Sequence, residues 1–595
     1  MTLLLRAARL GLGAALAALA TPACYPEGGN GTAPPTDSLY YPTGLAVSKG
    51  GNVLYAVNSD FDLQWNGGTL QSYNLFQIRQ DTAALIQANL AGSPPPPTLN
   101  ANFVTPLAPG QTTGCPGSQA IPANNGVGLG VLLGTACAPP VRSTAYIEDS
   151  ATIGAFATDL QLSIVDGLTT TGPMTAPNFE RLFAPVSGNA TVTWTNVGYD
   201  DPSAAPQPTD TVATFPPFDL HYAAPGQQAS GPQQTGNDPS SLDNSRGSTI
   251  PGEPFGLGQS QDGTVMVLTS ETATESSLLT TGMAPPSSPT SFPDEPTMQY
   301  VLTEMPNGGV GVASVPHDPN AGIALCEDVG DMPPCLRQAF LETNRTSAEV
   351  DLLRYYDDDG SSLHRPYLEK EAAFPITTNA PGTDSRGIAI DYTQRLACEA
   401  VPNADLTTCA QLPARVFIAS RSPPSLIVGE LGQPTPPGQG TYNPDQLQLL
   451  GNVPLTPGPS KVYLAPVVMP DQNGVPRYYL RVFVVCYDSN FIYVFDPNSL
   501  MTLNAAPEQI IVTGLGPYAM AFDPFSWQDV ATNAVVPVDS RQPAALGLKR
   551  YSFAYVASFT RSYMQIIDLD GSQPTADTFY SIVFTLGTPT PPKGT

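Results

Sequence analysis

A short pattern of turns and strands recurs along most of this 595-residue chain and restricts the fold more than any other feature. Each copy has a Pro or Gly lead-in, a short alternating strand, a turn, a second strand rich in aromatic and β-branched residues, a polar loop and a third strand. The clearest copy covers residues 42–75, with strands expected at 45–47, 53–57 and 69–75. This unit is a twisted meander, so the chain is predicted to be all-β.

The number of copies predicts how the units are arranged. Besides the copy at residue 42, units begin near Ser143, Arg181, Glu253, Asp384, Gly458 and Gly516. About seven such units would close into a ring and leave no open sheet edge. We therefore predict a β-propeller of seven blades, with six or eight blades as the alternatives, and one short helical candidate at 336–344.

Composition supports many turns around a large core. The chain has 65 proline and 53 glycine residues, which together make up about a fifth of its length, against a usual combined share of roughly 12%. Hydrophobic residues still make up 41% of the chain, enough to bury a core. The propeller is expected to span 40–587, with polar Pro-rich inserts near 93–112, 201–252 and 281–296 that cannot order themselves, and a tail at 588–595.

The first 23 residues form a three-part export signal. Arg6 and Arg9 precede an apolar stretch at 10–20, which is too short to span a bilayer, and a small residue stands just before Cys24. Residues 1–23 are therefore predicted to be a signal peptide. Residues 24–39 are polar and rich in turn formers, as expected of a flexible tether.

The residues before Cys24 read Leu-Ala-Thr-Pro-Ala and resemble a bacterial lipobox, in which the cysteine is lipidated and becomes the new N-terminus. The resemblance implies a lipid-anchored protein of the cell envelope, in the periplasm or at the outer membrane. No later stretch has about 18 continuous apolar residues, so attachment to the membrane would be through lipid alone. Ordinary signal cleavage, giving a secreted protein with a free or paired Cys24, remains the alternative.

The other seven cysteines suit an oxidising compartment. Three pairs are close enough in sequence to close local disulfide loops: Cys115 with Cys137, Cys326 with Cys335, and Cys398 with Cys409. Zinc is the alternative, but no Cys-x-x-Cys spacing supports it, so neither a metal nor another cofactor is expected. Cys486 is left over in a strand-like run, where a buried core thiol is expected.

The repeats resemble the YVTN-type β-propeller family between residues 40 and 570. The matching pieces are the lead-in Pro42-Thr43-Gly44, the turn Gln261-Asp262-Gly263, and the second strands Tyr55–Asn58 and Tyr555–Ser558. The chain as a whole is also similar to Gram-negative surface lipoproteins built from such a propeller. The resemblance implies the fold, and it says little about chemistry.

The meander predicts where a site would form. Strand one leaves its lead-in and strand two returns, so lead-ins and the loops after strand two should share one face. The polar residues expected on that face are Asn58, Asp60, Asp62, Asp384, Arg386, Arg421, Asp488, Asn490 and Arg561. Three of them, Arg386, Arg421 and Arg561, could hold an anionic or sugar-like ligand, because guanidinium groups grip carboxylates in a fork. Pairing of these arginines with aspartates of neighbouring blades is the competing interpretation.

Charge and motifs narrow the function classes. The chain has 51 acidic and 24 basic residues, a formal net charge of −27, and no basic run, so nucleic acid is not an expected partner. Neither a Gly-x-Ser-x-Gly elbow nor a phosphate-binding loop is present. We expect a non-catalytic protein that binds a protein, peptide or glycan ligand at the cell envelope. The alternatives are a hydrolytic propeller enzyme of lactonase type, which the repeat resemblance suggests, and a structural envelope component.

Overall fold

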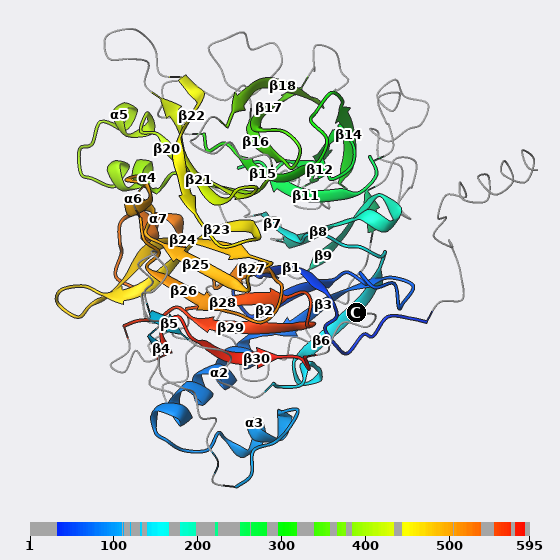
Figure 1. Cartoon of the computed structure of the whole chain (residues 1–595), viewed down its shortest axis with the longest axis vertical. Coiled ribbons are helices and arrows are strands. Elements are labelled where there is room, and N and C mark those ends of the chain that lie inside the picture. Colours follow the sequence, from blue (N-terminus) through cyan, green and yellow to red (C-terminus); the bar gives the residue numbers. More distant parts are fainter. Residues whose placement is uncertain are drawn as a thin grey trace, which may run out of the picture.

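The chain forms a seven-bladed β-propeller, as Figure 1 shows and as the repeat predicts. The computed structural model describes residues 32–109, 111, 119–120, 131–133, 140–165, 179–197, 221–223, 250–261, 263–282, 296–317, 338–357, 366–376, 384–433, 443–503, 505–536, 552–572 and 578–589. The leader, Cys24 and the residues from 590 onward lie outside this part of the chain.

Each blade is an antiparallel meander whose first strand faces the axis of the ring. Blade 1 consists of β1 (Pro42–Val47), β2 (Val53–Asn58), β3 (Gly68–Asn74) and β6 (Ile147–Ile153). Blade 2 consists of β7 (Gln161–Val165), β8 (Phe179–Val186), β9 (Thr191–Val197) and β10 (His221–Ala223). Blade 3 consists of β11 (Pro254–Gln259), β12 (Val265–Ser270), β13 (Ser276–Thr280) and β14 (Thr297–Leu302). Blade 4 consists of β15 (Gly309–Ser314), β16 (Ala339–Asn344), β17 (Glu349–Asp357) and β18 (Pro366–Pro375).

The remaining three blades follow the same plan. Blade 5 consists of β19 (Ser385–Asp391), β20 (Ala414–Arg421), β21 (Pro424–Gln433) and β22 (Asn443–Pro454). Blade 6 consists of β23 (Pro459–Pro470), β24 (Pro476–Cys486), β25 (Phe491–Phe495) and β26 (Gln509–Val512), extended by β5 (Val131–Leu133) and β4 (Gln119–Ala120). Blade 7 consists of β27 (Pro517–Phe522), β28 (Phe553–Ser558), β29 (Tyr563–Asp568) and β30 (Ile582–Leu586).

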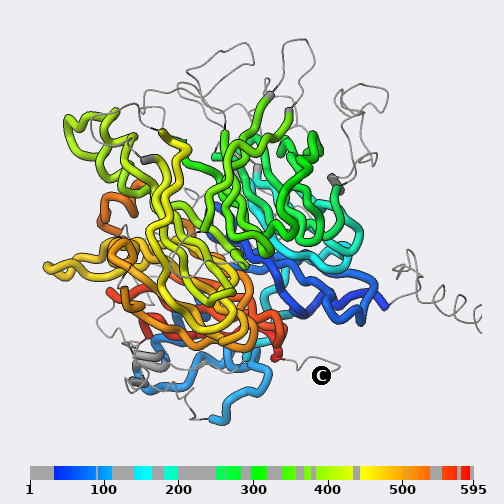
Figure 2. The backbone as a smooth tube through the Cα atoms, turned by 45° about the horizontal axis from the view of Figure 1, so that its top comes forward, coloured from blue at the N-terminus to red at the C-terminus, as the bar shows by residue number. Residues whose placement is uncertain are grey.

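The ring closes where blade 1 meets blade 7, at the contact between β1 and β27 (Figures 1 and 2). A segment between β3 and β6 reinforces this junction with helices α2 (Leu75–Leu90) and α3 (Pro97–Asn102). Val141, which follows them, lies beside β30: its N–H donates to the Thr585 carbonyl at 2.9 Å, and the Gly587 N–H donates back at 2.8 Å. The segment therefore joins the first blade to the last.

The α-helices of the described chain, α2 to α7, were not predicted from the sequence, and the one helix that was predicted is a strand. The helix predicted at 336–344 is instead strand β16, and the 16-residue helix α2 was not predicted. The insert near 93–112, which was expected not to order itself, contains α3, whose Leu99 is 1% exposed and holds the segment against the core. The expected tether at 24–39 is packed over its last part, where Leu39 is buried in the core between blades 1 and 7. No described helix is long and apolar enough to cross a membrane.

The number of blades was predicted correctly, but the assignment of repeats to blades was partly wrong. The two weak copies near Ser143 and Arg181 are not two blades: β6 is the outer strand of blade 1, and β7, β8 and β9 belong to blade 2. Blade 4 was not recognised at all. Its second strand, β16, is buried on both faces and so lacks the alternation that identifies a strand in a sequence.

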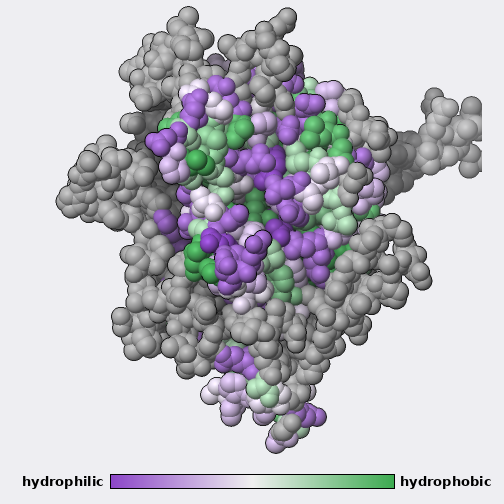
Figure 3. All heavy atoms as spheres, turned by 90° about the vertical axis from the view of Figure 1, so that its left-hand side faces the viewer, coloured by the Kyte–Doolittle hydropathy of each residue, from purple (hydrophilic) through white to green (hydrophobic). Residues whose placement is uncertain are grey.

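One face of the propeller carries the short helices α4 (Thr393–Glu399), α5 (Leu406–Ala410), α6 (Pro497–Leu500) and α7 (Trp527–Ala531), and we call it the helical face. These helices lie on the left of Figure 1, and Figure 3 looks onto that side, where hydrophilic and hydrophobic residues are interspersed.

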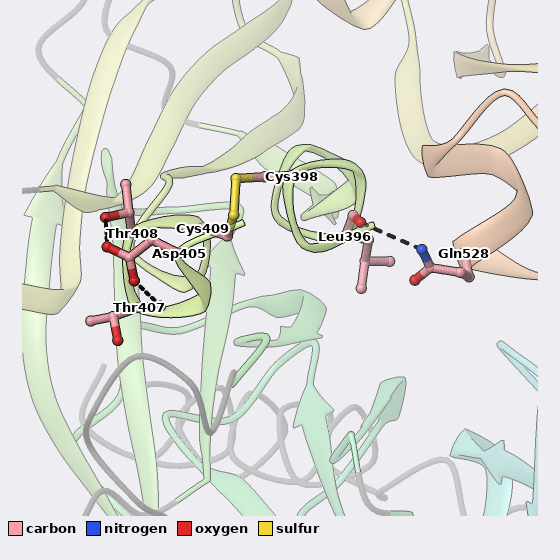
Figure 4. The surroundings of a disulfide bond; sticks show 7 residues. All are labelled: Leu396, Cys398, Asp405, Thr407, Thr408, Cys409 and Gln528. Carbon is pink, nitrogen blue, oxygen red and sulfur yellow. Dashed lines mark hydrogen bonds between the residues drawn. A yellow bond between two sulfur atoms is a disulfide. The ribbon is translucent and has the colours of Figure 1, made fainter. Parts of the chain in front are cut away.

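The disulfide predicted between Cys398 and Cys409 is confirmed, and it joins α4 to α5 (Figure 4). Asp405 caps α5 by accepting the Thr407 N–H at 3.1 Å, and α4 meets α7 through the Gln528 amide and the Leu396 carbonyl at 3.4 Å. Cys115, Cys137, Cys326 and Cys335 lie outside the described residues, as do the inserts at 201–220, 224–249 and 283–295. Cys486 is buried and forms no disulfide.

Candidate functional site

One backbone hydrogen bond recurs in all seven blades and fixes the geometry of the face opposite the helical face. The N–H of the residue that ends or directly follows the second strand donates to the carbonyl of the lead-in residue, at 2.7 to 3.1 Å. The donor and acceptor pairs are Ser59 and Tyr41, Ser187 and Phe156, Glu271 and Glu253, Arg345 and Gly308, Arg421 and Asp384, Tyr487 and Gly458, and Phe559 and Gly516. Lead-ins and the loops after second strands therefore meet on one face, which we call the lead-in face.

Three residues after the lead-in, four of the blades have glycine: Gly44, Gly256, Gly311 and Gly387. A Cβ atom at any of these positions would lie under 3.0 Å from the inner strand of the next blade or from the residues that lead into that strand. Glycine is thus required by the close approach of inner strands around the axis. Blade 7 has the next smallest residue, Ala519, at this position.

Blades 2 and 6 break this rule with charged residues, Asp159 and Lys461, and the two meet. The Lys461 Nζ atom lies 2.8 Å from an Asp159 carboxylate oxygen and 5.0 Å from the centre of the Tyr518 ring. Blades 2 and 6 are separated by blades 7 and 1, so the contact crosses the axial channel rather than joining adjacent blades. The two exceptions to the repeat are therefore complementary in charge and in position.

The ion pair keeps the Lys461 side chain charged. Burial lowers the pKa of Lys461, but Asp159, with Tyr463 and Tyr518, outweighs this effect and the net pKa lies above the usual value. Burial raises the pKa of Tyr463 and of Tyr518, so both phenols stay protonated at neutral pH. The channel thus holds a charged ammonium group together with two neutral phenols.

These residues line a cavity of about 570 Å³ along the propeller axis, and all seven inner strands or their lead-ins contribute to it. Its polar side chains include Arg386, Arg421, Lys461 and Asp159. Its apolar lining includes Leu45, Val47, Leu162, Phe255, Leu257, Val310, Val312, Ile388, Val462, Met520, Phe522 and Phe525. This size and mixture, mostly apolar with a few convergent polar groups, is typical of small-molecule sites.

The arginines of the cavity are engaged with carboxylates. Arg386 Nε donates to Asp384 at 2.6 Å, and its Nη1 atom lies 3.6 Å from Glu271 of blade 3. Arg421 of blade 5 pairs with Asp488 of blade 6. Arg421 thus pairs with an aspartate of the neighbouring blade, as the competing interpretation predicted. Arg386 pairs with Asp384 of its own blade and with Glu271 of blade 3.

The other residues of the predicted binding face have different surroundings. Asn58 is buried and donates to Thr69 and Gln71, both at 2.9 Å, so it fixes the end of β2. Asp60 accepts the Trp65 N–H at 3.2 Å, and Asn490 accepts the Gly516 N–H at 3.1 Å.

The structure therefore places Arg386 and Arg421 at the cavity, where they pair with Asp384 and Asp488, and Arg561 is not among the residues that line it. Ligand binding by this face stays a prediction.

Sequence reasoning missed the residues at the centre of the channel. Asp159, Lys461, Tyr463, Tyr487 and Tyr518 all line the cavity. The signal was present in the lead-in of blade 6, where the repeat's Pro-x-Gly reads Pro-Ser-Lys at 459–461. The fold does not require a charged side chain at this position, because five of the blades have glycine or alanine there.

Among the described residues, no three His, Cys, Asp or Glu side chains are grouped closely enough to hold a metal ion.

No family model and no curated protein matches this chain. Among solved structures, a protein of Bacteroides uniformis provisionally named a 6-phosphogluconolactonase shares 15% identity and a TM-score of 0.35, over 80% of this chain and 86% of that one. A Bacteroides fragilis protein with the same provisional name shares 11% identity and a TM-score of 0.37, over the same shares. The Kuenenia stuttgartiensis hydrazine synthase shares 9% identity and a TM-score of 0.36, over 91% and 99% of the two chains. These similarities are too distant to transfer an activity to this chain.

Proposed function

We propose that this protein is a non-catalytic binding protein of the cell envelope, which takes a small ligand with an anionic group into its axial channel. The observation that carries the proposal is the pair of charged exceptions to the repeat, Asp159 and Lys461, which meet inside a cavity of about 570 Å³. A propeller needs neither charge to close its ring, since four blades have glycine at this position.

The chemistry of the lining indicates the class of ligand. Arg386 and Arg421 lie at the lead-in end of the cavity, where their guanidinium groups can grip a carboxylate, sulfonate or phosphate. The apolar walls at Leu257, Val312 and Ile388 suit a hydrocarbon or ring portion. An amphipathic ligand with one acidic group therefore fits better than a fully polar one.

Binding is favoured over hydrolysis by the protonation of the central groups. A hydrolytic site needs a group that takes up a proton near neutral pH. The Lys461 ammonium is held charged by Asp159, and the phenols of Tyr463 and Tyr518 retain their protons because they are buried. These three groups can donate hydrogen bonds to a ligand, and they are poor proton acceptors.

The location of the protein outside the cytoplasm, held by lipid at Cys24, is part of the same proposal. It is supported by the sequence pattern at 1–23, which is typical of an export signal, and by the lipobox-like residues before Cys24. The disulfide between Cys398 and Cys409 suits the same oxidising compartment. Intact-mass analysis of membrane-bound protein from its native host tests it, with a Cys24→Ala variant as the matched comparison. Acyl mass on a chain that begins at Cys24, and release of the variant, are expected.

The binding proposal is tested by fluorescence titration with anilinonaphthalene sulfonate, an acidic dye with an apolar body. We expect saturable binding at one site, weakened about tenfold or more in Arg386→Gln because a charged hydrogen bond is lost. Arg477→Gln is the matched control, since Arg477 pairs with Asp471 on the helical face, at 2.8 Å and away from the cavity. Equal affinity in both variants would contradict the proposal.

A further inference from the structure

The described chain enters the propeller at the lead-in face, beside the loop that follows β2. The Asn66 N–H of this loop donates to the Thr32 carbonyl at 3.1 Å. Cys24 and Thr32 are eight residues apart in the sequence. An extended chain of that length spans at most about 29 Å, so a lipid on Cys24 would keep this loop near the bilayer.

The same loop displays two large apolar side chains to solvent. Phe61 is 57% exposed and Leu63 is 49% exposed. Leu515, in the lead-in of blade 7, is 41% exposed. Phe559 links the two segments, because the Phe61 ring packs on the Phe559 ring at 5.3 Å and the Phe559 N–H donates to the carbonyl of Gly516, the residue after Leu515. We call these three exposed apolar side chains of the lead-in face the rim patch.

The rim patch is held in place by its surroundings. The Phe61 ring also contacts Phe156 at 5.9 Å and Tyr41 at 6.2 Å, which places it on a layer of packed aromatic rings. The backbone of Leu63 has a left-handed φ of 52°, a strained conformation for a bulky residue that persists only when the structure around it enforces it. The Leu63 N–H donates to the Asp60 carbonyl at 3.1 Å. The loop therefore presents its apolar tips in a fixed geometry.

We propose that the lead-in face docks on the bilayer surface, with Phe61, Leu63 and Leu515 in contact with lipid. This inference rests on the proposed lipid anchor at Cys24. Aromatic and apolar side chains favour the interfacial region of a bilayer. The protein carries a net charge of −27, so the contact is apolar and does not depend on attraction to anionic headgroups. Docking would place the lead-in end of the cavity toward the membrane.

The chain supplies its own probes for this orientation. It has three tryptophans, of which Trp65 lies in the loop of the rim patch and Trp527 lies in α7 on the helical face. Both are half-buried, which makes them a matched pair. Trp194 is buried in blade 2 and is replaced by phenylalanine in every variant.

The experiment uses acylated protein, extracted from membranes and reconstituted into phosphatidylcholine vesicles with brominated acyl chains. A variant that retains only Trp65 should be quenched at least twofold more than one that retains only Trp527, at both low and high salt. Adding Phe61→Ser and Leu63→Ser to the Trp65 variant should abolish the difference, while the lipid keeps the protein on the vesicles. Thermal unfolding of this last variant confirms that it folds.

The outcomes separate the two proposals. Equal quenching of Trp65 and Trp527 in acylated protein would overturn the docking and leave the lipid anchor standing. The same result is expected if the rim patch instead binds a protein or a second copy of this chain. If the mature chain carries no acyl mass, the protein has no lipid tether. That result would overturn both the proposed lipid anchor and the proposed docking on the bilayer.

Discussion

Arg79 of helix α2 and Asp523 of blade 7 form a buried ion pair at the point where the propeller ring closes. Their side chains are 4% and 9% exposed, and the Arg79 Nε atom donates to Asp523 at 2.9 Å. Asp523 also accepts the Tyr555 hydroxyl at 2.8 Å and the Phe553 N–H at 2.9 Å. The pair thus ties the helical insert of the first blade to the last blade.

Removing one partner of this pair should strongly destabilise the protein. Arg79→Met leaves the Asp523 carboxylate buried without its cation, and we expect the free energy of unfolding to fall by about 3–5 kcal/mol. The double variant Arg79→Met, Asp523→Leu should recover part of the loss, because no charge stays uncompensated. Urea unfolding measures both, and Arg477→Gln, which breaks the more exposed pair with Asp471, should cost no more than about 1 kcal/mol.

The glycines of the inner strands should resist substitution. A Cβ atom at Gly311 would meet the backbone carbonyl of Arg386 in the next blade, which cannot move aside as a flexible side chain would. We expect Gly311→Ala to destabilise the protein by about 1–3 kcal/mol through overpacking. Gly252→Ala is the control, since no atom lies within 4 Å of its added Cβ. Similar melting temperatures for the two variants would show that the inner strands are not tightly apposed.

Two buried carboxyl groups should make stability depend on pH. Burial raises the pKa of Glu342 to about 8 and that of Asp568 to about 7. Because these pKa values are higher in the folded than in the unfolded chain, the folded state binds more protons between about pH 4 and 8, and its stability falls as pH rises through this window.

Glu342→Gln tests the larger of these effects. The variant keeps a partner for the Ser276 hydroxyl, which donates to Glu342 at 2.7 Å, and it removes the ionisation. The urea midpoint should drop less between pH 5 and pH 8 in the variant than in the wild type. An unchanged pH dependence would mean that Glu342 does not titrate in this range.

The fold could be predicted from the sequence because its signal is repeated and local. Lead-in turns and second strands such as Tyr55–Asn58 recur often enough to reveal the blades, even though blade 4 was overlooked. The run at Ala339–Asn344 contains good helix formers and is buried on both faces, so neither propensity nor alternation identified it as a strand. Helix α2 could have been found, since residues 75–90 contain neither proline nor glycine.

The candidate site was less accessible to sequence reasoning. The residues predicted on the lead-in face, including Arg386 and Arg421, follow from the meander geometry alone. The pairing of Asp159 with Lys461 does not, because it requires knowing that blades 2 and 6 approach each other across the channel. An alignment of the repeats would have shown that Asp159 and Lys461 are charged at a position where the other blades have glycine or alanine. Their opposite charges suggest that the two side chains form a pair.

Replacing Asp159 and Lys461, the two charged exceptions to the repeat, should weaken ligand binding and leave the stability of the fold nearly unchanged. The pair is partly exposed, so its net contribution to stability is modest. We expect the double variant Asp159→Ala, Lys461→Ala to unfold within about 1 kcal/mol of the wild type, since alanine occupies this position in blade 7. Its affinity for the acidic dye should nevertheless fall by about tenfold or more, because the ammonium group is gone. A large loss of stability would instead assign the pair a structural role.

The most direct test of the channel as the binding site is to fill it. Ala521 lines the cavity from β27, and Ala521→Trp would occupy much of the space available to a ligand. Titration of the dye into this variant, alongside the wild type and with folding checked by circular dichroism, should show saturable binding only in the wild type. Undiminished binding by a folded Ala521→Trp protein would contradict a ligand site in the axial channel.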